Sequence, residues 1–219
     1  MRIVFCLPGR TFSNNFLQSW TTLLQYLPKY GITPILSNSY SPLLYYVRNQ
    51  CLGGDSTRGV KQLPFDGKLE YDYTMWIDSD MVFTVNDFIG LLNMNKDIAS
   101  GIYKTSDGKH YATVENWDKD YYAKNGNFEF LTDKLIGERK KPFEVEYTGF
   151  GWVLIKKEVF ESLEYPWFQP IWEEFEVQGK KFREFTMEDV SFCRTIVKNG
   201  YKIYVDPTLK IGHEKSCIL

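Results

Sequence analysis

The sequence predicts an α/β fold in which a mostly parallel central sheet is flanked by helices and carries a smaller antiparallel β addition. Three observations support this prediction. The chain opens with an apolar strand over 2–7, and an amphipathic helix follows it. Strands and helices then alternate to about residue 103, which is typical of a parallel sheet. The second half mixes short strands, glycine turns and helices, and this mixture favours an added antiparallel piece.

In the first half, Pro8 and Gly9 break the opening strand, and Ser13 is a candidate N-cap. The helix after Ser13 has apolar residues at three-to-four spacing until Pro28. The other expected elements are strands over 32–36, 73–83 and 97–103, helices over 42–51 and 85–94 (capped by Thr84 or Asn86), and a mobile glycine-rich loop over 53–59.

In the second half, residues 104–142 are polar and rich in aromatics, and without a helical period they predict loops or hairpins. A helix is expected to begin near Thr186, with Asp189 completing a loose capping box. The other expected elements are strands over 144–147 and 152–155 around a glycine turn, a short helix over 157–163, and a late strand over 202–205.

Composition narrows the class of protein. The chain has 219 residues, 43% of them hydrophobic and 25% charged, which fits one globular domain over 1–219. Its end after Leu219 is also compatible with a domain of a longer protein. A net charge of −2 with interspersed signs argues against a nucleic-acid partner. We expect a cytoplasmic protein without a signal peptide or membrane span, because its apolar runs are short and its four cysteines lack metal or redox spacing. These cysteines are Cys6, Cys51, Cys193 and Cys217.

The most informative stretch is 73–83, an apolar run that contains the two carboxylates Asp78 and Asp80. An ionised carboxylate in such a run needs a cationic or hydrogen-bonding partner. Side chains two residues apart in a strand point the same way, so both can reach one divalent ion at the strand's carboxyl end. Ligands of open α/β sheets bind at that edge. A solvated turn is the alternative, and this stretch alone leaves it open.

The run resembles the DxD motif of metal-dependent glycosyltransferases of the GT-A fold. Three further stretches resemble that family in its order along the chain: a glycine-aromatic turn in 147–160, an acidic helix start in 185–194 and a histidine segment in 207–215. Each also has a structural alternative, namely a tight turn, helix capping and a structural histidine. Together the matches span roughly residues 1–215 and imply a GT-A-like fold. The resemblance extends to chlorovirus-like glycosyltransferase domains of large DNA viruses that act on capsid glycans.

The resemblance implies a role for each motif. Asp78, Asp80 and His213 would hold Mn²⁺ or Mg²⁺ against the diphosphate of a nucleotide-sugar. Glu188 or Asp189 would take the acceptor's proton if the reaction inverts the sugar's anomeric centre, and a retaining reaction is the alternative. Arg48 would contact the base or ribose, with a surface ion pair as its alternative. The expected donor-binding residues are Pro8, Arg10, Thr11, Arg48, Asp78, Ser79, Gly149, Gly151 and Lys215.

The predicted function is therefore transfer of a hexosyl group from a nucleotide-diphosphate sugar, with UDP favoured, to a glycan or glycoprotein. Residues 1–103 would form the nucleotide-binding half and 104–219 the acceptor-side half. One alternative is a nucleotidyltransferase that makes nucleotide-sugars, although the loop after the first strand lacks the glycine-rich basic sequence of such enzymes. The other is a non-catalytic sugar-binding module, which would leave the four acids without a role.

Overall fold

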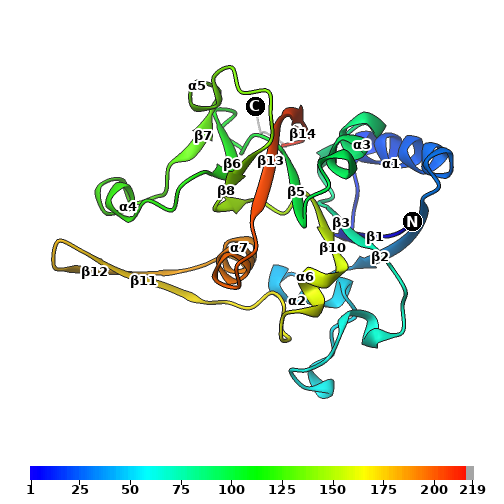
Figure 1. Ribbon diagram of the computed structural model, residues 1–219, viewed down its shortest axis with the longest axis horizontal. Helices are drawn as coiled ribbons and strands as arrows, with labels where there is room; N and C mark the ends of the chain where they lie inside the picture. The colour runs from blue at the N-terminus through cyan, green and yellow to red at the C-terminus, as the bar shows by residue number, and fades with distance from the viewer. Residues whose placement is uncertain (216–219) are drawn as a thin grey trace.

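The computed structural model describes residues 1–215 and is built on a seven-stranded sheet (Figure 1). In spatial order the strands are β2 (Thr33–Ser39), β1 (Arg2–Pro8), β3 (Tyr73–Ile77), β10 (Trp152–Lys156), β5 (Ile98–Ile102), β13 (Ile203–Lys210) and β8 (Phe143–Val145). Only β10 and β8 run antiparallel to their neighbours in this sheet. The mostly parallel central sheet predicted from the sequence is confirmed.

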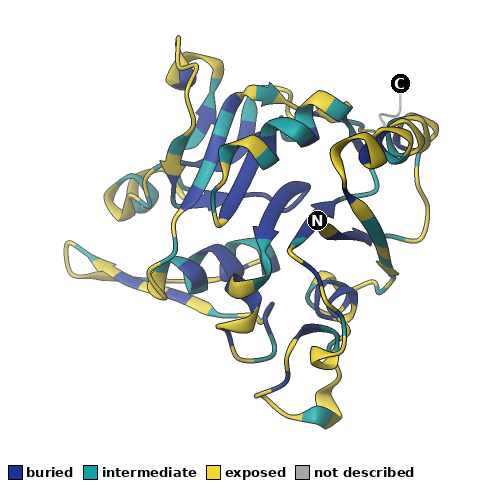
Figure 2. Cartoon of the chain, turned by 45° about the vertical axis from the view of Figure 1, so that its right-hand side comes forward, coloured by how far each residue is buried: buried dark blue, intermediate teal, exposed yellow. Residues whose placement is uncertain are grey.

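Helices cover both faces of this sheet. The first face packs against α1 (Asn14–Tyr26) and α3 (Val85–Met94). The second face packs against α2 (Leu44–Cys51), α6 (Lys157–Glu161) and α7 (Glu188–Lys198). Figure 2 shows the buried residues along the strands and on the helix sides that face them. Two apolar cores, one on each face, therefore fix the ends of the central strands in space.

Smaller elements surround the sheet. A three-stranded sheet contains β7 (Phe130–Thr132), β6 (His110–Val114) and β9 (Tyr147–Thr148), and a two-stranded sheet pairs β4 (Met81–Val82) with β14 (Gly212–His213). A hairpin of β11 (Trp172–Val177) and β12 (Lys180–Phe185) extends away from the body (Figure 1). The remaining helices are α4 (Lys119–Asn125), α5 (Asp133–Ile136) and the 3-10 turns η1 (Leu27–Tyr30), η2 (Ser56–Arg58) and η3 (Pro64–Gly67).

Two predicted helix starts have the expected caps. The Ser13 hydroxyl accepts a hydrogen bond of 2.9 Å from the backbone N–H of Phe16. At α3 the cap is Thr84, which forms a reciprocal capping box with Asp87. Each cap satisfies backbone donors that the first helical turn leaves without partners.

The predicted cap at Thr186 was wrong, and two other predictions about local structure were incomplete. The N-cap of α7 is Met187 rather than Thr186, because the Thr186 hydroxyl donates to the Ile171 carbonyl at 2.9 Å instead. Residues 104–142 contain the predicted antiparallel strand pairing, between β6 and β7, but also α4 and α5, which are too short to show a helical period. The expected mobile loop 53–59 contains η2, where Asp55 caps the turn by accepting from Thr57 N–H.

Other expectations concern the whole chain. β10, from the second half of the chain, lies between β3 and β5 from the first half, so both halves build one sheet. Cys6, Cys51 and Cys193 are buried and free, while Cys217 lies outside the described residues. Within residues 1–215, no helix combines the length and apolar character needed to cross a membrane.

Candidate active site

The carboxyl end of β3 is where the predicted metal motif lies. Asp78 and Asp80 follow the last residue of β3, and the Met81 N–H closes a turn on the Asp78 carbonyl at 3.2 Å. β4 then pairs with β14, which sets His213 opposite Met81. Two segments more than a hundred residues apart in the sequence therefore meet at this sheet edge.

Asp80 lies between the imidazole of His213 and the ammonium group of Lys215. Its Oδ2 is 3.2 Å from His213 Nε2 and 2.7 Å from Lys215 Nζ. Burial alone would raise the pKa of the Asp80 carboxyl, but hydrogen bonds from His213 and Lys215 outweigh it and lower the pKa to about 2. Asp80 is therefore ionised at any physiological pH and is a ready ligand for a cation.

His213 is oriented by the protein on its other ring nitrogen. Its Nδ1 lies 2.6 Å from the backbone carbonyl of Lys104, so Nδ1 carries the proton and donates it there. Tyr103 packs edge-on against the imidazole, with ring centroids 5.1 Å apart. Although burial opposes it, the hydrogen bond with Asp80 raises the pKa of His213. In the neutral ring, Nε2 keeps its lone pair and is aimed at Asp80.

The fit of this edge to a divalent ion follows from the donor set. A carboxylate and an imidazole whose second nitrogen is fixed by a carbonyl form a pair that suits Mn²⁺. Asp78 does not join them, and no three His, Cys, Asp or Glu side chains among residues 1–215 gather as a metal-binding group. Asp80 and His213 would therefore be the two protein ligands of such an ion.

Arg48 on α2 connects the two acidic motifs. Its guanidinium donates to Asp78 through Nη1 at 3.0 Å and through Nη2 at 3.3 Å, and its Nε lies 3.1 Å from Glu188 Oε1. The side chains of Arg48 and Glu188 are only 3% and 2% exposed, so this cation and this anion are held away from water. Burial works to lower the pKa of Arg48, but the Asp78 and Glu188 carboxylates outweigh that effect and raise it. The alternative of an ion pair is thus correct for Arg48, and the pair is buried rather than on the surface.

Asp189, the second acid at the start of α7, has a different environment. Its Oδ2 accepts a hydrogen bond of 2.8 Å from the Tyr147 hydroxyl, and its Oδ1 accepts one of 2.7 Å from the Val190 N–H. Loss of hydration raises the pKa of the Asp189 carboxyl, the neighbouring Glu188 carboxylate raises it further, and the pKa is about 6. A carboxylate with this pKa can take up a proton close to neutral pH.

The glycine turn lies between these groups and serves close packing. A Cβ atom on Gly149 would lie 2.2 Å from the Tyr103 hydroxyl oxygen, and one on Gly151 would lie 3.0 Å from the same atom. The Tyr103 hydroxyl also accepts the Gly151 N–H at 3.0 Å. The structure therefore gives both glycines a packing role beside Tyr103, the residue that also contacts His213.

A cleft of about 490 Å³ opens beside Asp80. It brings together four of the predicted site residues, Thr11, Ser79, Asp80 and Lys215, and adds Phe12, Ser13 and Glu214. Arg10 lies against the Tyr40 ring instead, 5.8 Å from its centroid, and Pro8 is the last residue of β1, paired with Ser39.

Sequence reasoning missed several members of the site. Tyr147 lies in the glycine motif but was given no role, and Tyr103 ends a strand with no signal beyond being aromatic. Glu214 directly follows His213; its Oε1 accepts from the Asn15 amide, while its Oε2 is buried and has no hydrogen-bond partner within residues 1–215.

Comparison with known proteins places the fold. No protein-family model matches the chain, and no curated protein matches its sequence. Among solved structures, A197 from STIV superposes with a TM-score of 0.55 at 17% identity, covering 100% of this chain and 97% of that one. GalNAc-T7, solved with UDP, GalNAc and Mn²⁺, superposes with a TM-score of 0.56 at 13% identity. The match covers 97% of this chain but only 43% of GalNAc-T7.

At this level of identity the likeness concerns the fold alone. The α/β arrangement with helices on both faces and small antiparallel sheets is GT-A-like, as the sequence predicted. Any activity of this chain has to be argued from its own residues.

Proposed function

We propose that this protein is a metal-dependent glycosyltransferase that moves a sugar from a nucleotide-diphosphate sugar, with UDP favoured, to a glycan or glycoprotein acceptor. One observation carries the proposal: Arg48 joins the acid pair after β3 to the acid pair that starts α7. A candidate cation site and a candidate proton acceptor are thereby held at one edge of a GT-A-like sheet. Capsid glycans of a large DNA virus remain a predicted acceptor from the family resemblance.

In this proposal Asp80 and His213 hold Mn²⁺ or Mg²⁺. Such an ion, when bound, acts as a Lewis acid on the departing diphosphate. The Lys215 ammonium, 2.7 Å from Asp80 in the structure, lies where it can donate to the same phosphate oxygens. The Lys104 carbonyl keeps the His213 ring in the tautomer that presents Nε2.

The nucleotide would lie in the cleft beside the end of β1. Thr11, Ser13 and Ser79 offer hydroxyl groups there, and Phe12 offers a partly exposed ring. Glu214 also lines this cleft, with its Oε1 bound to the Asn15 amide. These groups supply orientation, while the cations at Asp80 supply charge complementarity.

Asp189 is the proposed general base. Its carboxylate takes the proton from the acceptor hydroxyl as that oxygen bonds to the anomeric carbon, and the bond from this carbon to the diphosphate oxygen breaks. The diphosphate leaves with the electron pair, so the proton and the charge both balance. Glu188 is bound to Arg48 and buried, which supports a positioning role for it rather than proton transfer.

The test is an assay of nucleotide-diphosphate release from UDP-, GDP- and CDP-sugars, with and without Mn²⁺ and with glycan acceptors. We expect release with one nucleotide and only with metal, and loss of transfer in Asp189→Asn but not in the surface control Glu174→Gln. Formation of nucleotide-sugar from a nucleoside triphosphate and a sugar phosphate would instead support the nucleotidyltransferase. Glycan binding without any turnover would support the sugar-binding module.

A further inference from the structure

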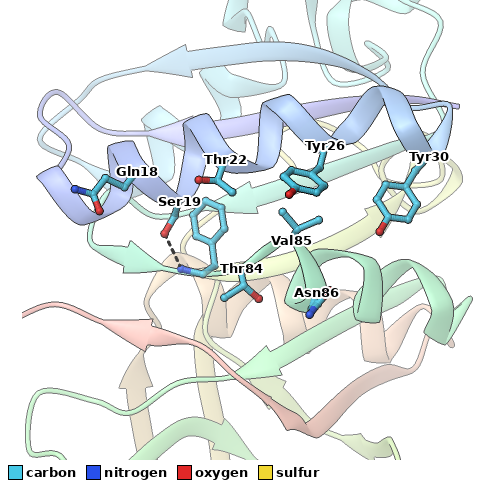
Figure 3. A pocket seen from close by; sticks show the side chains of 9 residues that line it. Gln18, Ser19, Thr22, Tyr26, Tyr30, Thr84, Val85 and Asn86 are labelled. Atoms are coloured by element: carbon cyan, nitrogen blue, oxygen red, sulfur yellow. Dashed lines mark hydrogen bonds between the residues drawn. The ribbon is translucent and has the colours of Figure 1, made fainter.

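A second cleft lies between α1 with η1 and the start of α3, and the proposed activity does not use it. It has a volume of about 470 Å³, within the usual range for small-molecule sites. Figure 3 shows side chains from both elements pointing into the space between them. The lining residues are Gln18, Ser19, Thr22, Tyr26, Tyr30, Phe83, Thr84, Val85 and Asn86.

The lining contains no Lys, Arg, His, Asp or Glu side chain. It presents the amides of Gln18 and Asn86 and the hydroxyls of Thr22, Tyr26 and Tyr30, all on exposed residues. These groups include both donors and acceptors, so they suit a ligand whose own groups do both. A sugar hydroxyl is such a group.

The helix start at this cleft does not favour an anion. The Thr84 and Asp87 capping box takes up the backbone N–H groups of these two residues at the start of α3, and it places the Asp87 carboxylate, which repels an anion, at that end of the helix. With no basic side chain in the lining either, a phosphate or nucleotide finds no cationic partner here. A cation finds no carboxylate in the lining.

Two tyrosine rings give the cleft a wall for stacking. Tyr26 and Tyr30 are 40% and 50% exposed, although they extend from a helix and a turn that pack on the core. The Lys29 ammonium lies 4.1 Å from the centroid of the Tyr26 ring, an interaction that restricts the ring's motion. Because Lys29 is outside the lining, the ring still presents a surface to the cleft. Exposed aromatic surface on a rigid element binds flat, weakly polar ligand faces at low entropic cost.

The floor of the cleft is rigid. Ser19 Oγ accepts the Phe83 N–H at 3.1 Å, which ties α1 to the chain segment directly after β4 (Figure 3). The Phe83 ring packs on Phe16 and Trp152, with centroid distances of 5.8 Å and 4.6 Å. The cleft is therefore formed before a ligand arrives, and binding does not have to order it.

We propose that this cleft is a binding site for a neutral carbohydrate, one or two sugar units long, separate from the site at Asp80. The rings of Tyr26 and Tyr30 stack on the apolar face of a sugar, and the Thr22 and Asn86 side chains bond its hydroxyls. The proposal does not depend on the glycosyltransferase assignment, because it concerns binding alone and needs neither metal nor nucleotide.

The test is titration of the ¹⁵N-labelled protein with neutral disaccharides (lactose, cellobiose, mannobiose and chitobiose) in EDTA, followed by amide NMR shifts. We expect at least one disaccharide to shift the amides of residues 18–30 and 83–86 in a saturable way. Saturable shifts confined to the surroundings of Asp80 and Asp189 would overturn the proposal while leaving the glycosyltransferase assignment intact. Absence of saturable shifts with the whole panel would also overturn it.

Variants make the assignment specific. We expect Tyr26→Ala and Tyr30→Ala each to raise the dissociation constant for the disaccharide about tenfold, since each removes a stacking ring. Tyr46→Ala is the matched control, because Tyr46 is 61% exposed but lies on α2 away from this cleft, and its affinity should equal wild type. Thermal unfolding of each variant checks that the fold is kept. Wild-type affinity in both cleft variants would overturn the proposal.

Discussion

The molecule contains two acid pairs, Asp78 with Asp80 and Glu188 with Asp189. Both pairs contact Arg48, but the surroundings of their second members differ. In each pair the first carboxylate binds the buried guanidinium of Arg48. The second carboxylate has its own partners, which are cationic around Asp80 and neutral around Asp189. In the proposed function the first member of each pair therefore positions the site, and the second acts on the ion or the acceptor.

The two second members have pKa values shifted in opposite directions. Hydrogen bonds from cations hold the pKa of Asp80 at about 2 despite its burial. Loss of hydration and the Glu188 carboxylate raise the pKa of Asp189 to about 6. When neighbouring structure separates the pKa values of two carboxylates in this way, it assigns them different tasks. Asp80 suits a permanent anion that holds a cation, and Asp189 suits a base that accepts a proton.

The largest effect is expected for Asp80→Ala. This change removes one of the two protein ligands proposed for the ion, and with it charge stabilisation worth several kcal/mol at the leaving group. Transfer measured as nucleotide-diphosphate release should fall below detection, while the far-ultraviolet circular dichroism stays that of wild type. Turnover near the wild-type rate in this variant would contradict the proposed role of an ion bound at Asp80.

A smaller loss is expected for Asp189→Asn, on the order of 10³-fold in kcat, because general-base catalysis typically contributes about that much. Donor binding should be unchanged, since Asp189 contacts Tyr147 and the α7 backbone rather than the cleft at Asp80.

The pH dependence gives an independent check on Asp189. A base must be deprotonated to act, so in the wild-type enzyme kcat/KM should rise with pH through about 6 and then level off. The profile is measured with donor concentrations well below KM. An ascending limb centred near pH 4 would show that the base is a carboxylate without this environment.

The variant Arg48→Met tests the contacts that Arg48 makes with Asp78 and Glu188. The change leaves the Glu188 carboxylate buried without its cation, so the free energy of unfolding should fall by about 3 kcal/mol. Lys202→Met is the control: its partner Glu144 is 50% exposed, and loss of such a surface pair should cost less than about 1 kcal/mol. Equal losses from urea melts of the two variants would contradict the buried linkage.

The smallest effect is expected at the packing contact between Gly149 and Tyr103. Gly149→Ala places a methyl group 2.2 Å from the Tyr103 hydroxyl oxygen, and relief of this overlap should cost about 1–3 kcal/mol in unfolding free energy. Tyr103→Phe removes that oxygen, so the double variant should be more stable than the sum of the two single changes. Strict additivity in thermal melts would mean that the two residues do not compete for this space.

Much of the fold could be predicted from the sequence because residue patterns within short segments indicate where helices and strands form. The three-to-four spacing after Ser13 and the capping residues around 84–87 are short-range signals, and both helices formed where expected. The β11–β12 hairpin was missed although a short signal exists, since polar and apolar residues alternate over 174–177 before a turn at Gln178 and Gly179. The Thr186 cap failed because a tertiary partner, the Ile171 carbonyl, took its hydroxyl.

The site was less predictable because its contacts are long-range. Arg48 lies 30 residues from Asp78 and 140 from Glu188, and no spacing rule joins them. The sequence motifs indicated all four acids but treated the members of each pair alike. Only packing distinguishes them, since it sets which carboxylate binds the buried guanidinium of Arg48 and which one does not.

The central claim is that Asp80 and not Asp189 supports metal-dependent nucleotide binding. Isothermal titration of UDP, with and without Mn²⁺, into wild type, Asp80→Ala and Asp189→Asn tests it most directly. The account predicts binding that requires Mn²⁺ in wild type, persists in Asp189→Asn and is lost in Asp80→Ala. UDP binding of equal strength with and without Mn²⁺, or unchanged in Asp80→Ala, would contradict it.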